Sequence, residues 1–169
     1  MDPLRIYDYL TRARQRVLDA ARPLTAEQHA REFPIGPGTL GRTLTHIMIC
    51  ESAYVRRMQG REVPPYDQWP IRDEAPPPFA ELEAAWAAQA DETRAALAAV
   101  RDWSAPIEFR RNGEGGRPII VTASAADLFT QLALHEVHHR AQAMNMLRHL
   151  GVTLDDIDFN AMMYHRRPA

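Results

Sequence analysis

The sequence predicts an all-α protein: a four-helix bundle with a small β-hairpin before the last long helix and a short C-terminal helix. Four long segments carry apolar residues at helical spacing, and one segment around residue 112 alternates with a period of two instead. The chain has 169 residues, 46% of them hydrophobic, which is enough to bury a core. No repeat or low-complexity linker divides it, so we expect a single domain over residues 1–169.

The first long helix is expected to begin directly after Asp2. The Asp2 side chain can cap the helix, and Pro3 suits the first helical position because its missing N–H has no partner there. Apolar residues then recur at helical spacing until Pro23 ends the helix. Three basic residues of this segment are expected to lie largely on the outside: Arg12, Arg14 and Arg16.

The second long helix is expected to run from Thr39 to about Gln59. Thr39 can cap its start, and Gly60 suits the position just past its end. Before it, Thr25 and Gln28 form a capping-box pattern that can open one short helical turn.

A proline-rich connection over residues 61–78 follows, and its prolines exclude a regular helix there. The third long helix is expected over residues 78–100. Residues 106–121 then alternate between apolar and polar around Asn112 and a glycine-rich turn, which predicts a β-hairpin.

The fourth long helix is expected to begin at a capping box formed by Ser124 and Asp127 and to continue to about Leu150. A short amphipathic segment, residues 157–164, is expected to close the chain as a small helix.

The fourth long helix carries a candidate metal site. His135 and His139 are four residues apart, so both imidazoles project from one face of the helix and can hold one ion. His46, in the middle of the second long helix, is the candidate third ligand because bundle cores build metal sites from facing helices. Three imidazoles suit Zn, Ni, Cu or Fe and leave a coordination position for water, which is typical of catalytic sites.

Several neighbouring residues are further candidates, either as ligands or as groups that orient the imidazoles. His138 could replace His139 as a ligand, and Cys50, four residues after His46, could add a thiolate or be a small buried core residue. Three polar residues could orient the imidazoles or simply lie on helix surfaces: Glu51, Glu136 and Gln142.

The letters from His135 to His139 also match the zincin pattern, in which Glu136 would be the general base. The rest of the chain fits a zincin poorly. The metzincin extension would need glycine and histidine where the chain has Gln142 and Asn145, and no glutamate follows Glu136. A zincin-type metallohydrolase is therefore the less favoured interpretation.

Composition excludes several other classes. The net charge of −2 gives no support for nucleic-acid binding, and no apolar stretch is long enough to suggest a membrane partner. All 20 basic residues are arginine, which excludes lysine-based chemistry. The N-terminus has no leader pattern and there is a single cysteine, so we expect a cytoplasmic protein.

The order of these motifs resembles the DinB/YfiT-like family of metal-dependent enzymes. The resemblance rests on Thr43-Leu44-Thr45-His46 and on the run from His135 to Gln142, and it covers most of the chain. It implies a divalent metal, Zn or Ni, held by His46, His135 and His139. Related members are thiol-dependent S-transferases that use a low-molecular-weight thiol such as mycothiol or bacillithiol, and many form homodimers.

Two functional classes follow from the sequence. One is a metal-dependent transferase or hydrolase that acts on a small molecule, in particular a thiol-dependent S-transferase that acts on a small electrophile. The other is a non-catalytic metal- or ligand-binding stress-response protein. The sequence leaves open which metal, thiol and substrate are used, and whether His138 or Cys50 contributes.

Overall fold

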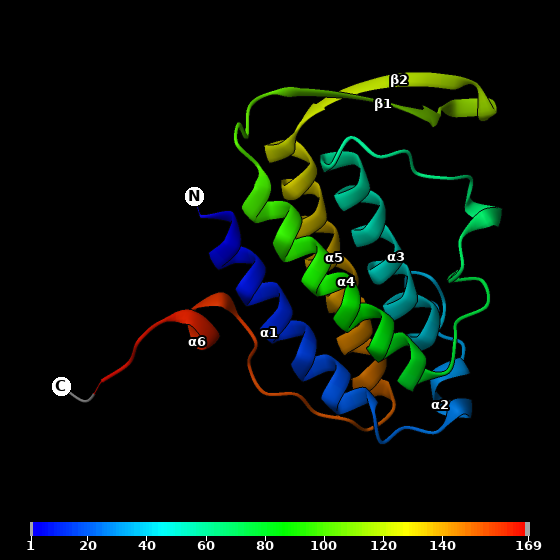
Figure 1. The fold of residues 1–169 in the computed structure, drawn as a ribbon. Coiled ribbons are helices and arrows are strands. Elements are labelled where there is room, and N and C mark those ends of the chain that lie inside the picture. Colours follow the sequence, from blue (N-terminus) through cyan, green and yellow to red (C-terminus); the bar gives the residue numbers. More distant parts are fainter. Residues whose placement is uncertain (1, 168–169) are drawn as a thin grey trace.

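The computed structural model describes residues 2–167, with every side chain in that range except that of Glu114. The ends of the predicted domain, Met1, Pro168 and Ala169, lie outside the described residues. Within the described range the protein is mostly helical, and four long helices lie side by side (Figure 1). They are α1 (Pro3–Ala21), α3 (Leu40–Met58), α4 (Phe79–Ala99) and α5 (Ala125–His149).

The helix starts agree with the capping residues read from the sequence. The Asp2 side chain accepts a hydrogen bond from the backbone N–H of Arg5, and the Thr39 side chain accepts one from Arg42. The capping box of Ser124 is complete, as is that of the short helix α2 (Ala26–Ala30). These starts are therefore confirmed, as is the position of Gly60 past the end of α3, where its φ of 68° suits glycine.

The predicted hairpin is also confirmed and lies across one end of the long helices (Figure 1). Strand β1 (Pro106–Asn112) pairs antiparallel with β2 (Pro118–Ser124), and a 3₁₀ turn, Glu114–Gly116, joins them. Phe109 pairs with Val121, and this pair lies on the strand face that contacts α3. A two-stranded sheet is marginal alone, so this packing supports the hairpin.

The remaining elements lie beside the long helices (Figure 1). The proline-rich connection contains a short 3₁₀ helix, Tyr66–Gln68, and the C-terminal helix α6 (Phe159–Met163) packs against α1. Apolar side chains from all four long helices fill the interior, with Leu44, Trp86 and Leu147 among the least exposed. None of the helices in residues 2–167 combines the length and apolar character that a membrane crossing needs.

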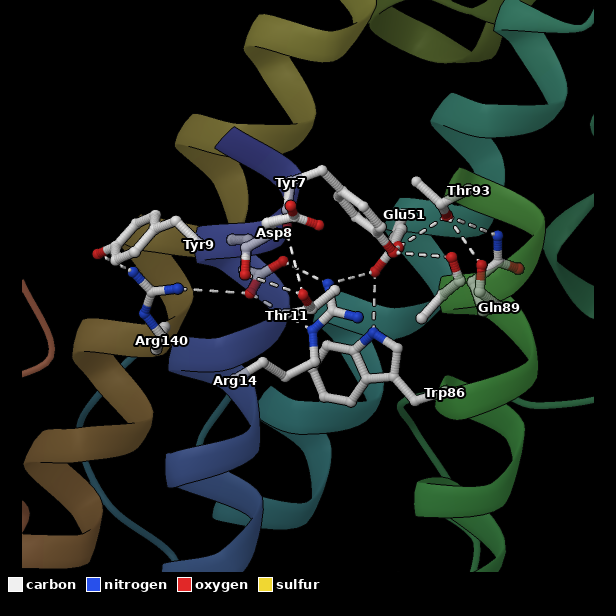
Figure 2. Close-up of polar contacts among 12 residues, drawn as sticks. Tyr7, Asp8, Tyr9, Thr11, Arg14, Glu51, Trp86, Gln89, Thr93 and Arg140 are labelled. Atoms are coloured by element: carbon white, nitrogen blue, oxygen red, sulfur yellow. Dashed lines mark hydrogen bonds and ion pairs between the residues drawn. The ribbon is translucent and has the colours of Figure 1, made fainter. Parts of the chain in front are cut away.

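One expectation about α1 is wrong. Arg12 and Arg16 are exposed as predicted, but Arg14 lies in the interior and is only 5% exposed (Figure 2). Its guanidinium donates to Glu51 Oε2 at 2.8 Å and to Glu136 Oε2 at 2.6 Å. Two buried carboxylates therefore offset the cost of burying this cation.

Other buried groups complete the hydrogen bonds of these carboxylates. Glu51 also accepts from Tyr7, Trp86 and Thr93, which brings together side chains of α1, α3 and α4 (Figure 2). Arg140 lies near Glu136 on α5 and also donates to the hydroxyl of Tyr9. Glu51 of α3 and Glu136 of α5 both bind Arg14 of α1. The network therefore helps to fix which sides of α3 and α5 face the interior.

Candidate metal centre

The three predicted histidine ligands converge between α3 and α5. The Nε2 atoms of His46 and His135 are 3.2 Å apart. The ring of His139 lies 4.7 Å from that of His46 and 4.5 Å from that of His135, measured between centroids. All three rings are partly exposed, so small molecules can approach them from solvent. The packing of α3 on α5 therefore brings His46 next to His135 and His139, which lie one helical turn apart on α5.

The facing imidazoles of His46 and His135 fit a divalent cation. Two imidazole nitrogens bound to one tetrahedral Zn²⁺ lie roughly 3.3 Å apart, given Zn–N bonds of about 2.0–2.1 Å, and the two Nε2 atoms are 3.2 Å apart. Burial, assisted by the charges of the other histidines, lowers the pKa of His135 to about 4. Burial also lowers the pKa of His139. Both rings are thus neutral at pH 7, which is the form that ligates a metal.

Cys50 lies beside this cluster, one helical turn after His46. Its Sγ is 3.7 Å from the Nε2 of His46, and the ligand atoms of His46, Cys50 and His135 all lie within 4.8 Å of one another. Burial, followed by the nearby charge of Asp73, raises the pKa of the thiol to about 12. Cys50 is therefore protonated at neutral pH when no cation is bound nearby.

The carboxylate that orients His46 comes from the proline-rich connection and was not anticipated from the sequence. Asp73 Oδ2 lies 2.7 Å from His46 Nδ1, so an N–H at Nδ1 can donate to it and the other ring nitrogen faces His135. The hydroxyl of Tyr66 donates to the second oxygen of Asp73. Burial raises the pKa of Asp73, but these two hydrogen bonds outweigh it and bring the pKa below its ordinary value. No regular spacing connects Asp73 with His46, so a sequence pattern could not have identified the pair.

Gln142 orients a histidine, which is one of the two roles that the sequence left open for it. Its Oε1 lies 2.7 Å from His139 Nδ1, and its Nε2 lies 3.1 Å from the Nε2 of the exposed His138. The backbone of Gly36 approaches this amide so closely that an added Cβ would lie 2.1 Å from Oε1. The loop before α3 therefore holds the Gln142 side chain in place, and it needs glycine at this point.

Glu51 and Glu136 lie in the buried network around Arg14 rather than at the histidines. The oxygens of Glu136 accept hydrogen bonds from Arg14 and Arg140, and both glutamate residues are buried. Glu136 projects to a different side of α5 from His135 and His139, since a one-residue step turns a side chain by about 100° around a helix.

The comparison with known families agrees with these motifs. The model of the DinB family matches residues 1–168, nearly the whole chain. No curated protein matches the sequence.

Proposed function

Because this chain belongs to the DinB family, we propose that it is a metal-dependent enzyme that transfers a small-molecule thiol to a small electrophile. The observation that carries this proposal is the 3.2 Å separation of the Nε2 atoms of His46 and His135, beside the ring of His139. We assign the side-by-side packing of the four long helices to the bundle architecture predicted for this family.

The proposed roles of the residues follow from their contacts. His46, His135 and His139 would hold one divalent cation, Zn or Ni, while Asp73 and Gln142 keep two of the rings in the orientation for binding. A cation in such a site lowers the pKa of a thiol or water at its open position.

The source of the nucleophile is the reason to favour a small-molecule thiol. The chain contains no lysine, and the Cys50 thiol, with its pKa of about 12, is a poor nucleophile at neutral pH. Glu136 is engaged by two arginines, which argues against its acting as the base of a zincin-type hydrolase. A thiol from solution could supply the nucleophile instead, because the imidazoles are partly exposed and it can reach them.

A non-catalytic metal-binding protein is the second candidate, and the position of Cys50 favours it. If its sulfur became a fourth protein ligand, the site would be closed, as in structural zinc sites.

We further propose, from the family resemblance, a homodimer in the cytoplasm whose partners are small molecules rather than nucleic acid or membrane.

The proposal is tested by metal content and thiol conjugation. The protein should be purified without chelator or histidine tag, its Zn and Ni measured by mass spectrometry, and metal-dependent conjugation of thiols to monochlorobimane followed by fluorescence. His46→Ala and His135→Ala should lose both metal and conjugation. His149→Ala should keep metal and conjugation, because His149 lies at the end of α5 with its ring near that of Phe33.

Three results would separate the candidates. A wild-type protein that takes up no metal at micromolar Zn or Ni contradicts both. Metal uptake with no conjugation by any thiol tested contradicts the transferase and supports the binding protein. Cys50→Ser should leave metal content and conjugation intact if the site is open, and should weaken metal binding if the sulfur is a ligand.

A further inference from the structure

Two arginines lie at the end of α3 that the hairpin covers, about three helical turns from His46. On α3, His46, Cys50, Tyr54 and Arg57 recur every three or four residues, so they share one side of the helix. The Tyr54 ring lies 5.8 Å from the His135 ring. The guanidinium carbon of Arg57 is in turn 5.9 Å from the centre of the Tyr54 ring. The Tyr54 ring thus lies between the His135 ring and the guanidinium group of Arg57.

The second arginine comes from the hairpin. Phe109 and Arg111 are two residues apart on β1 and therefore point to the same face, and Phe109 lies 4.8 Å from the Arg57 guanidinium carbon. Arg111 consequently faces α3, and its charge acts on both Arg57 and Tyr54. Arg110, the intervening residue, projects from the opposite face.

Neither cation has a carboxylate partner among the described side chains. The Nε of Arg57 is buried and has no hydrogen-bond partner within residues 2–167. Burial lowers the pKa of Arg57, and the nearby charge of Arg111 lowers it further. Two adjacent cations with one unpartnered, buried donor form an arrangement that an anion would stabilise.

We propose that Arg57 and Arg111 bind a carboxylate of the small molecule whose reacting thiol lies at the three histidines. This inference rests on the proposed function and names its substrate class: a thiol that carries an anionic group at the far end of a short apolar chain. The guanidinium group matches a carboxylate because its N–H donors lie in one plane and can bind both oxygens. The Tyr54 ring would support the chain between the two ends.

A matched pair of thiols tests this specificity. The Zn²⁺-loaded protein is titrated by calorimetry, at low salt, with mercaptohexanoate and with mercaptohexanol, which differ only in the carboxylate. We expect wild type to bind mercaptohexanoate about tenfold more tightly. Arg57→Gln and Arg111→Gln should bring this ratio close to one without altering the Zn²⁺ stoichiometry or the affinity for mercaptohexanol. Arg110→Gln should retain the wild-type ratio.

The outcomes separate this inference from the proposed function. If wild type binds Zn²⁺ and both thiols with equal affinity, or if the preference survives in Arg111→Gln, the inference is wrong and the proposed function stands. If wild type binds neither Zn²⁺ nor thiol, the proposed function fails and the inference fails with it. Arg57→Gln could unseat the hairpin by removing the stacking on Phe109, but Arg111→Gln leaves that contact in place.

Discussion

Replacement of Arg14 by methionine is a sharp test of the buried network. Arg14 donates to Glu51 at 2.8 Å and to Glu136 at 2.6 Å, and the three side chains are 6%, 2% and 3% exposed. Removal of one partner of a buried ion pair costs about 3–5 kcal/mol, because a charge is left uncompensated. Glu51 keeps its donors from Tyr7, Trp86 and Thr93, so we expect the lower end, about 3 kcal/mol.

This loss should be visible in urea and thermal unfolding followed by circular dichroism at neutral pH. For a protein of this size, a loss of about 3 kcal/mol corresponds to a decrease of roughly 6–12 °C in Tm. The controls are Arg12→Met and Arg16→Met, exposed positions on the same helix, which should change the free energy of unfolding by no more than about 0.5 kcal/mol.

A double variant separates charge from packing. In Arg14→Met with Glu51→Gln, both the buried cation and one buried anion are gone, and Arg140 remains near Glu136. We expect this variant to recover about half of the lost stability. The reasoning is refuted if Arg14→Met is no less stable than Arg16→Met, or if the double variant is less stable than Arg14→Met.

Three further predictions concern the metal centre. Asp73→Asn should weaken Zn²⁺ binding by about 10- to 100-fold, measured against a chromogenic chelator, because the adjacent imidazole loses its carboxylate partner. Gly36→Ala should weaken it by about tenfold in the same assay, since the new Cβ would displace the Gln142 amide. The metal-free protein should lose stability to urea as the pH falls from about 6.5 to about 4, because His135 takes up a proton at its ordinary pKa of 6.5 when unfolded but only at about 4 when folded.

Each of these predictions has a control within the chain. Asp67→Asn changes an exposed residue of the same connection and should leave Zn²⁺ affinity unchanged. Gly60→Ala also places alanine at a positive φ, here 68°, but its Cβ would meet nothing within 4 Å, so it should cost stability without weakening Zn²⁺ binding. His135→Gln should flatten the pH dependence, and a variant that keeps the wild-type slope would show that another group is responsible.

Much of the fold could be predicted because its signals are local. Asp2, Thr39 and Ser124 each cap a helix with an oxygen that reaches a backbone N–H three residues later, and the alternation around Asn112 follows from strand geometry. The pairing of His135 with His139 is local in the same sense, since one helical turn aligns them. His46 could be nominated because it lies within an apolar segment, and the family resemblance pointed to the same residue.

What only the tertiary structure decided depends on contacts between elements. Arg14 looks like its exposed neighbours Arg12 and Arg16 until the carboxylates of two other helices are placed around it. The partner of His46 likewise comes from a loop, since Asp73 lies in the proline-rich connection, and Gly36, in the turn before α3, lies against Gln142.

The sequence by itself determined the order of helices and hairpin and the alignment of His135 with His139, because caps, periodicity and helical spacing act over a few residues. The tertiary structure decided which charges are buried, what orients the imidazoles of His46 and His139, and that the hairpin brings Arg111 to the end of α3 that carries Arg57. These outcomes depend on desolvation and on distances between segments far apart in the chain, which no local pattern records.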